Sequence, residues 1–465
     1  MTARFTLKPL SMLLLASALS ACALGPDYQR PQQSMPEQFK QMAGWKVAAP
    51  ADEQLKSAWW QLYNDALLNQ LVDGLELDNQ NLAAAQAQYR QAQALVGSVR
   101  SRLLPDVGSS AGMSRGGQGE GAVSKQYDLG LNAAWELDIW GKLRRNLEAS
   151  DAEFKASAAE LAALRLSLQS ELVQSYLQLR VLDEQKRLLE ATVQAYQRSL
   201  QLTQNQYEAG IVPRSDVAQA MTQLKSAEAQ AIDLNWQRAQ YEHAIAVLVG
   251  KTPAQLSIEV VEGAPALPSI PVALPSALLE RRPDIAAAER RVMAANARIG
   301  VAQAAWFPDL TLSASAGYRA ASFANWIEAP SRLWSLGPQL ALSLFDGGAR
   351  RAELERSEAA YDQTVAQYRQ TVLDSLREVE DNLVQLEVLK QEAVIQQEAL
   401  EAARESLRLV GNQYRAGTVD FNSVVNVQAT ALSNERASVN LQGSQLLASV
   451  RLIAALGGGW QDDQH

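Results

Sequence analysis

The chain has 465 residues and a formal net charge of −9, and aromatic residues amount to only 6% of it. A composition rich in Ala, Leu, Gln, Glu, Ser and Arg favours long helices or coiled coils. An acidic chain without a basic tract is a poor nucleic-acid binder, because phosphate contacts need clustered Lys and Arg. Two histidines and one cysteine nearly exclude a Cys/His metal centre or a histidine-dependent triad, so we expect no catalysis, no bound metal and no cofactor.

The N-terminal residues predict export and lipid attachment. Residues 1–21 combine a basic start with an apolar stretch, which is typical of a signal peptide. Leu19-Ser20-Ala21-Cys22 resembles a bacterial lipobox, in which Cys22 is acylated on sulfur and becomes the mature N-terminus; an ordinary secretory signal with an incidental cysteine is the alternative. Ala23 after the cysteine indicates sorting to the outer membrane. No later apolar run approaches the roughly 20 residues of a membrane helix, so a membrane crossing would need β-strands.

Most of the chain is a tandem internal repeat. Asn205–Gly210 matches Asn412–Gly417 at an offset of 207, and the same offset relates Gly250 to Gly457. A register held this long indicates duplication rather than chance. The predicted parts are a lipidated N-terminal and equatorial segment over 22–77, repeat 1 over 78–250, a Pro-rich equatorial linker over 251–282, repeat 2 over 283–457 and a tail over 458–465.

Each copy is predicted to hold a helix, two strands, a long helix and a return helix. Pro105 and Pro308 end the first helices. The long helices contain no proline or glycine up to Ala209 and Val410 and repeat apolar residues every seven positions, as a coiled coil does. In repeat 1 we predict a helix over 78–104, strands over 107–115 and 126–138, a long helix over 142–209 and a return helix over 215–249. In repeat 2 we predict a helix over 283–306, strands over 309–318 and 336–345, a long helix over 349–416 and a return helix over 422–456.

The predicted strands have one apolar and one polar face. In 126–138, Asp128, Asn132 and Glu136 alternate with apolar residues, a period-two pattern that is typical of a membrane β-barrel wall whose polar face lines a lumen. A soluble sheet with one buried face shows the same alternation. Four strands cannot close a barrel, and an open edge is not tolerated in lipid. Two chains would give eight strands with a filled interior, whereas three give twelve strands and an aqueous lumen; strand lengths alone do not exclude four chains.

The turns between long and return helices are predicted from glycine. Gly210 and Gly417 stand where a helix ends in a left-handed residue, and Ser215 and Asn422 are expected to cap the returning helices.

Several short motifs together resemble the lipoprotein branch of the TolC-like outer membrane factors. They cover essentially the whole mature chain and comprise Gly25-Pro26-Asp27-Tyr28-Gln29-Arg30-Pro31, Trp59-Trp60, Asp65, Arg281-Arg282-Pro283-Asp284-Ile285, Phe307-Pro308 and Ala455-Leu456-Gly457-Gly458-Gly459-Trp460. The resemblance implies a mainly α protein with membrane β-strands: a trimeric 12-stranded β-barrel, with four strands per chain, continuous with a long periplasmic α-helical barrel. It also implies a homotrimer in the outer membrane, extending into the periplasm and docking to a periplasmic membrane-fusion adaptor and an inner-membrane pump, usually of the resistance-nodulation-division (RND) type.

The resemblance further implies a gate at the periplasmic helix tips, closed as an iris by tyrosine, arginine and acidic residues. The positions that match it here, or lie beside it, are Tyr207, Gly210, Asp216, Tyr414, Gly417, Asp420, Ser423 and Asn426. Ser423 and Asn426 stand where the family often has acidic rings, which leaves the charge of the constriction open. Ordinary capping and packing is the alternative role for these residues.

We therefore predict an outer-membrane channel subunit of a tripartite efflux or export system, a passive exit duct for small molecules such as drugs, toxic compounds or metal ions. The exit duct of a type I protein-secretion system is the main alternative. A surface-anchored coiled-coil scaffold would not need two amphipathic hairpins, and a hydrolase would need a nucleophile and base that the sequence does not bring together.

Overall fold

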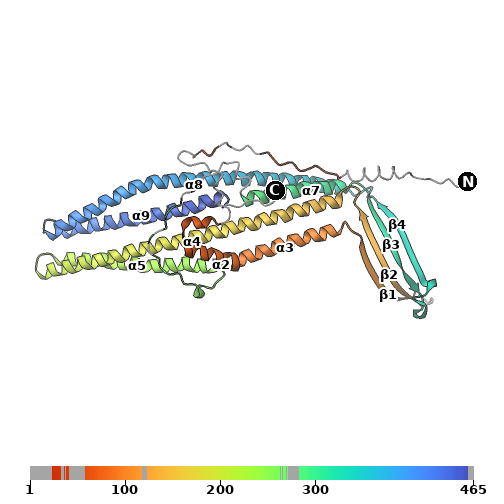
Figure 1. The fold of residues 1–465 in the computed structure, drawn as a ribbon, viewed down its shortest axis with the longest axis horizontal. Coiled ribbons are helices and arrows are strands. Elements are labelled where there is room, and N and C mark those ends of the chain that lie inside the picture. Colours follow the sequence, from red (N-terminus) through yellow and green to blue (C-terminus); the bar gives the residue numbers. More distant parts are fainter. Residues whose placement is uncertain are drawn as a thin grey trace. The chain divides into compact units, whose positions relative to one another are not determined.

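The computed structural model describes residues 23–32, 36, 38–40, 58–117, 123–261, 263, 265–268, 270 and 282–458 (Figure 1). Cys22 lies outside these residues. The chain divides into two compact units. The strand unit comprises 1–33, 87–160 and 284–371, and the hairpin unit comprises 34–86, 161–283 and 372–465. In the described part of the chain, no helix combines the length and apolar character needed to cross a membrane.

The strand unit holds two similar helix–strand–strand segments. In the first, α3 (Gln80–Ser101) ends before Pro105 and is followed by β1 (Asp106–Gly116) and β2 (Ser124–Leu137). In the second, α7 (Pro283–Ala304) is followed by β3 (Asp309–Ala320) and β4 (Arg332–Ala341). The proline after each first helix forces extended geometry on its neighbour, so the helices end where the sequence predicts.

The last strand lies earlier in the chain than expected. We predicted it over 336–345, but β4 spans Arg332–Ala341. Its pairing with β3 runs from Tyr318↔Arg332 to Asp309↔Ala341. The ladder stops there because Pro308 precedes β3 and has no backbone N–H to offer a further residue. Two short 3₁₀ turns, Phe323–Asn325 and Ala329–Ser331, lie in the connection between β3 and β4.

The four strands form one antiparallel sheet in the order β1-β2-β3-β4. The register separates apolar from polar residues. On one face Trp135 pairs with Leu312, and on the other Glu136 pairs with Thr311. Because side chains alternate along a strand, every second pair belongs to the same face. The outer edges, β1 and β4, have no partner strand among the described residues.

The hairpins contain helix pairs of equal length. The first is α4 (Lys142–Glu208) with α5 (Arg214–Leu248), and the second is α8 (Ala349–Arg415) with α9 (Phe421–Ala455). The long helices have 67 residues each and the return helices 35 each, and each return helix runs beside its long partner (Figure 1). At 1.5 Å per residue a long helix measures about 100 Å. The equal lengths confirm the tandem internal repeat.

Heptad positions of the long helices form much of the hairpin core. Leu182 and Leu189 of α4 are buried with Leu234 of α5, and Val372 and Val379 of α8 are also buried. This is the seam that the seven-residue spacing predicts.

A buried polar network, not expected from the sequence, fixes the segment before α3. The helix α2 (Ala66–Asp78) is capped by Asp65, whose Oδ1 accepts from the N–H of Leu67 at 3.0 Å. Its Oδ2 accepts from Tyr176 Oη at 2.7 Å and from Arg180 Nη1 at 2.6 Å. Arg180 Nη2 donates to the carbonyl of Gly263 at 2.8 Å, so one arginine of α4 holds both the N-terminal segment and the linker.

Candidate functional site

The turn at the end of each hairpin has the geometry of a glycine-terminated helix. Gly210 has φ +74° and Gly417 φ +73°. The N–H of Gly210 donates to Tyr207 O at 2.9 Å, and that of Ile211 to Gln206 O at 2.9 Å. These two bonds satisfy carbonyls that a helix end leaves without partners, and the positive φ favours glycine. Gly417 makes the same bond to Tyr414 O, also at 2.9 Å.

The two tyrosines at the tip occupy different environments. Tyr414 is buried, with 6% of its surface exposed, whereas Tyr207 is 44% exposed. Tyr414 packs with Phe421 at a ring separation of 5.6 Å and donates its hydroxyl to Gln206 Oε1 at 2.6 Å. Burial raises the pKa of Tyr414 above its ordinary value, and Asp216 adds to the shift. The repeat therefore holds one tyrosine that joins the two hairpins and one that faces solvent.

A hydrophobic cluster surrounds Tyr414 and draws on both hairpins. Its buried members are Tyr196, Leu200, Ala220, Leu224, Ala227, Tyr414, Phe421 and Val424. Since α4, α5, α8 and α9 all contribute, the two tips pack against each other within one chain.

The acidic and polar tip residues mostly serve as local caps. Asp420, not the expected Asn422, caps α9: its Oδ1 accepts from Ser423 N at 2.9 Å and from Ser423 Oγ at 2.6 Å. The Ser423 hydroxyl, more than any other group, holds the pKa of Asp420 below its usual value. The first return helix begins after Pro213, and the expected Ser215 cap is not formed.

Two other predicted gate residues remain on the surface. Asp216 lies in the first turn of α5, where a carboxylate is favoured by the helix dipole, and accepts from Ser215 Oγ at 3.2 Å. Asn426 is exposed on α9. The structure thus brings Asp216 within electrostatic range of Tyr414, and it leaves Tyr207 and Asn426 exposed to solvent in the single chain.

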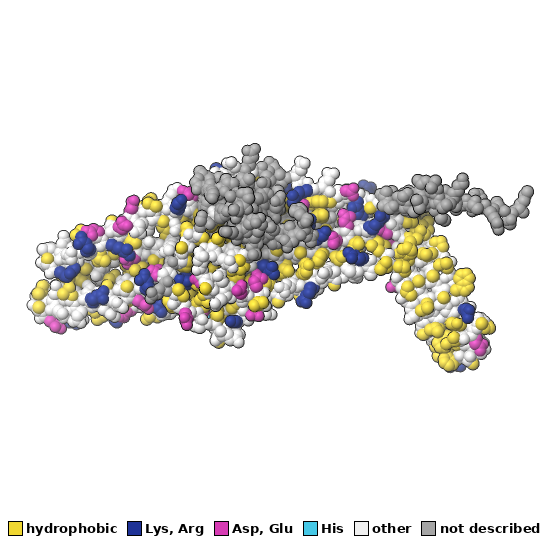
Figure 2. All heavy atoms as spheres, viewed as in Figure 1, with side chains coloured by type: hydrophobic (Ala, Val, Ile, Leu, Met, Phe, Trp, Pro, Cys, Tyr) yellow, Lys and Arg dark blue, Asp and Glu magenta, His cyan; other side chains and the backbone are white. Residues whose placement is uncertain are grey.

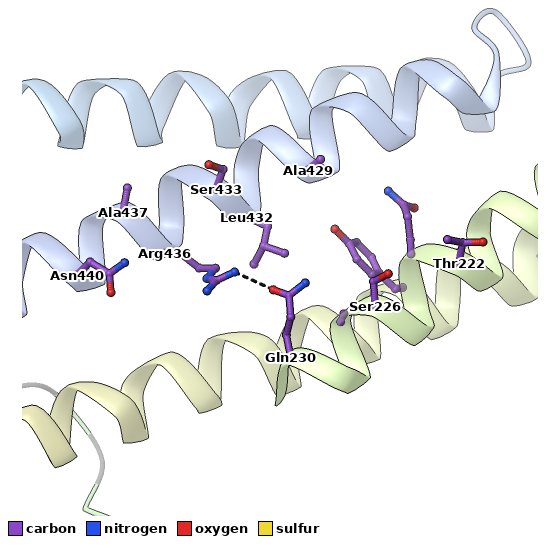
Figure 3. Close-up of a pocket in the computed structure, with 12 residues that line it drawn as sticks. Thr222, Ser226, Gln230, Ala429, Leu432, Ser433, Arg436, Ala437 and Asn440 are labelled. Carbon is purple, nitrogen blue, oxygen red and sulfur yellow. Dashed lines mark hydrogen bonds between the residues drawn. The ribbon is translucent and has the colours of Figure 1, made fainter. Parts of the chain in front are cut away.

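An open groove lies between α5 and α9. It has a volume of about 560 Å³ and is lined mainly by small and polar side chains, among them Thr222, Ser433 and Asn440. Arg436 Nη1 crosses it to donate to Gln230 Oε1 at 2.7 Å (Figure 3). This pair cannot be recognised from the sequence, because one Gln and one Arg on helix surfaces give no signal until the hairpins are placed side by side.

The residues predicted to line a lumen share the polar face of the sheet. Asp128 Oδ1 accepts from Arg319 Nε at 2.6 Å, and Glu136 lies 3.4 Å from Lys142 Nζ. Asn132 pairs across the ladder with Ser315. Ser315 and Ser335 lie 2.8 Å apart, Oγ to Oγ. Asp128 is thus paired with an arginine of the neighbouring strand and Glu136 with a lysine at the start of α4, as charged groups on a surface next to water are.

The opposite face exposes large apolar side chains. Trp334 is 77% exposed, Leu336 65% and Leu340 66%, and hydrophobic side chains gather over the sheet in Figure 2. Exposed apolar area of this extent marks a surface that contacts something other than water.

The residues that follow Cys22 are held at the start of α4. Arg145, a buried side chain, donates from Nε to Leu24 O at 3.0 Å and from Nη2 to Asp27 Oδ1 at 3.0 Å. Asn296 Nδ2 of α7 donates to Pro26 O at 2.8 Å. The sequence by itself does not single out Arg145, because nothing in its local pattern distinguishes it from the neighbouring Arg144.

Comparisons with known proteins agree over nearly the whole chain. A family model described as "Outer membrane efflux protein" matches residues 71–251 and 274–458. The chain is 32% identical to the pyoverdine export outer membrane protein OpmQ of Pseudomonas aeruginosa, covering 99% of this chain and 98% of that protein. It is 31% identical to the toluene efflux pump outer membrane protein TtgF of Pseudomonas putida, covering 97% and 96%. Among solved structures, it resembles the outer-membrane channel OprN with a TM-score of 0.89 and 34% identity, over 95% of this chain and 100% of that one.

Proposed function

The chain belongs to the outer membrane efflux protein family, and from that membership we propose that three copies form a passive exit duct, gated at the helix tips. The family and the fold class predicted from the sequence are confirmed. The protein is an outer-membrane channel subunit of an efflux system. Trimer contacts, gate residues, lipid attachment and pump partners are parts of the proposal.

The two-faced sheet with free edges is the observation that carries the proposal. Its apolar face suits lipid and its polar face suits water. Unpaired backbone groups at β1 and β4 cannot face hydrocarbon, so each edge needs a neighbouring strand. Pairing of β4 with β1 of the next subunit closes the cylinder. Three subunits supply twelve strands, which is wide enough for an aqueous lumen lined by Asp128, Asn132 and Glu136.

The tip residues form the gate in this proposal. Tyr414 and Gly417 fix how the second hairpin packs on the first, and the exposed Tyr207 and Asn426 are free to meet another subunit. Loosening the cluster around Tyr414 separates the hairpins and widens the opening.

Lipidation of Cys22 anchors the mature chain. The contacts of Arg145 hold Leu24 and Asp27, which follow the cysteine in the chain, at the start of α4. Acyl chains on one residue give stable anchoring without a membrane helix.

The partners are a periplasmic membrane-fusion adaptor and an inner-membrane pump, with the RND type favoured by the efflux relatives. Those relatives are named for cargoes as different as toluene and pyoverdine, so substrate choice is assigned to the pump rather than to the duct. The exported class is small molecules: drugs, toxic compounds or metal ions. A type I secretion exit is the alternative function, and no described residue favours it.

Conductance tests the proposal directly. The lipidated protein, purified in detergent, should run as a trimer and conduct in planar bilayers, with a larger conductance when Tyr414→Ala loosens the tip. Replacing Leu336 on the apolar face by Asp should block barrel insertion, whereas Ser335→Asp on the polar face should leave conductance within about twofold. A monomeric preparation, or a trimer that never conducts, would overturn the proposal.

A further inference from the structure

Three cations lie on the apolar face, in the half of the sheet that is away from the helices. Arg115 and Lys125 pair directly across β1 and β2, and Arg332 pairs with Tyr318 across β3 and β4. By the alternation of side chains, all three share the face that carries Tyr127, Leu129 and Trp334. All three are exposed, and none forms an ion pair within the described part of the chain.

The arrangement of these charges calls for an anion. Two like charges directly opposite each other on a sheet destabilise it, and Arg115 and Lys125 are such a pair. Within the four strands no Asp or Glu lies on this face. Asp128, the nearest carboxylate on a strand, belongs to the other face and is already paired with Arg319.

A hollow in the apolar face begins at Arg332. It has a volume of about 480 Å³, and its side-chain walls include Leu129, Leu131, Tyr318 and Trp334, while Ala316 leaves space between them. The guanidinium of Arg332 lies 6.0 Å from the ring centroid of Tyr318, at the margin of the hollow. A cation therefore adjoins an apolar depression, which is the pairing that a lipid with an anionic headgroup requires.

An aromatic cluster marks the same end of the sheet. Tyr127 lies 5.7 Å from Phe323 and 6.0 Å from Trp326, ring centroid to centroid. Aromatic side chains of this kind collect at the level of lipid headgroups. Arg115 and Lys125 therefore stand at headgroup depth, and Arg332, which shares the register level of Leu129 and Tyr318, stands at the margin of the hollow.

We propose that this face binds lipid A, the bisphosphorylated and multiply acylated glycolipid, with its phosphates on Arg115, Lys125 and Arg332 and one acyl chain in the hollow beside Ala316. This inference rests on the proposed function, which puts the helices in the periplasm and hence this end of the sheet in the outer leaflet. A single-phosphate phospholipid offers fewer charges for three cations, so lipid A is the occupant that the charge count favours.

Native mass spectrometry of the intact trimer, titrated with hexa-acylated lipid A, measures the binding. Arg332→Gln should weaken lipid A binding by about tenfold, since it removes one charge-assisted contact. Combining it with Arg115→Gln and Lys125→Gln should weaken binding by on the order of a hundredfold or more. Ala316→Phe fills the hollow but keeps every charge, and it should also lower affinity. Arg319→Gln is the matched control: it removes an arginine from the same strand end on the opposite face and should leave binding unchanged.

Binding measurements with other lipids test which lipid this face prefers. Monophosphoryl lipid A should bind about tenfold more weakly than the bisphosphorylated form, and phosphatidylglycerol should compete poorly. Equal binding of phosphatidylglycerol, or lipid A affinity that is the same in wild type, Arg332→Gln and Ala316→Phe, would refute the inference. Conductance in phosphatidylcholine bilayers is measured in parallel, so that a conducting trimer indifferent to lipid A refutes this inference alone. A chain that neither trimerises nor conducts refutes the proposed function and the inference with it.

Discussion

Gly210 and Gly417, 207 residues apart, adopt the same left-handed conformation and bond to the same tyrosine position: each N–H donates to the carbonyl of the tyrosine three residues earlier, at 2.9 Å. A duplicated sequence thus builds the same turn twice. The side chains of the two tyrosines then diverge, because only Tyr414 is covered by the other hairpin.

Substituting the turn glycines should destabilise the tips through backbone strain alone. Gly417→Ala places a Cβ in open space but on a residue with φ +73°, which costs about 1–2 kcal/mol in unfolding free energy. Gly411→Ala, in α8 and also in open space, is the control and should be neutral or stabilising. Chemical denaturation monitored by circular dichroism gives both values. Equal effects at the two positions would contradict the strain argument.

Truncation of Tyr414 should loosen the gate far more than truncation of Tyr207. Tyr414→Ala removes a buried ring from the inter-hairpin cluster and is expected to cost about 3–5 kcal/mol. Tyr414→Phe removes only the hydroxyl, with its hydrogen bonds to Gln206 and Thr203, at about 1 kcal/mol. The measurement is the entry of large antibiotics into cells, with the amount of trimer in the outer membrane checked by immunoblot. Antibiotic entry should be fastest in Tyr414→Ala and slower in Tyr414→Phe. It should be closest to wild type in Tyr207→Ala, because the Tyr207 ring is not part of the buried cluster. A larger leak from Tyr207→Ala would instead place the gate between subunits.

Breaking the Asp65–Arg180 pair should destabilise the hairpin unit. Both side chains are largely buried, with 14% and 6% exposed, so Arg180→Ala leaves a carboxylate without its cation and is expected to cost about 3–5 kcal/mol. Asp65→Asn keeps an acceptor for the α2 cap. A double-mutant cycle of these two substitutions should show a coupling energy well above that of an exposed pair such as Arg351–Glu355. Additive effects would show that the two side chains act independently.

Removing Arg145 should release the segment behind the lipidated cysteine. Arg145→Ala deletes the donors to Leu24 and Asp27, and limited proteolysis should then cleave between Cys22 and Arg30 much faster than in wild type. Gly300→Ala tests the same contact by crowding, because its Cβ would stand 2.7 Å from Leu24 O. Arg298→Ala, an exposed arginine of α7, is the control. Unchanged cleavage in all three variants would argue against the contact.

Lowering the pH through the pKa of Asp420 should weaken the N-terminal cap of α9. The pKa of Asp420 is held below its ordinary 3.8 by Ser423, so the folded state favours the carboxylate. The stabilisation is fully present above the ordinary pKa, and it is lost as the pH falls below about 3.8 through the lowered value. Asp420→Asn cannot titrate, and the difference in unfolding midpoint between wild type and this variant should therefore shrink between pH 5 and pH 3. A difference that is constant with pH would exclude this role for Asp420.

Much of the fold could be predicted from local patterns. Pro105 and Pro308 end helices because proline cannot continue a helix. The period-two alternation in β2 separates apolar from polar residues because successive side chains of a strand point to opposite faces of the sheet. Glycines at 210 and 417 predict turns, since only glycine takes a left-handed backbone freely. The seven-residue spacing predicts which positions of α4 and α8 are buried. These features depend on neighbours in the chain, so the sequence alone determined them, along with the family.

Long-range packing decided the rest. The position of β4 depends on its register with β3, and the cap of α9 depends on which of Asp420 and Asn422 reaches the first free N–H. The difference between Tyr207 and Tyr414 arises because only one of them is covered by residues far away in the sequence. The strand register likewise decides that Arg115, Lys125 and Arg332 share one face of the sheet. Matching turn motifs in the two repeats carry no information about which copy is covered, because burial is a property of the partner surface and not of the segment itself.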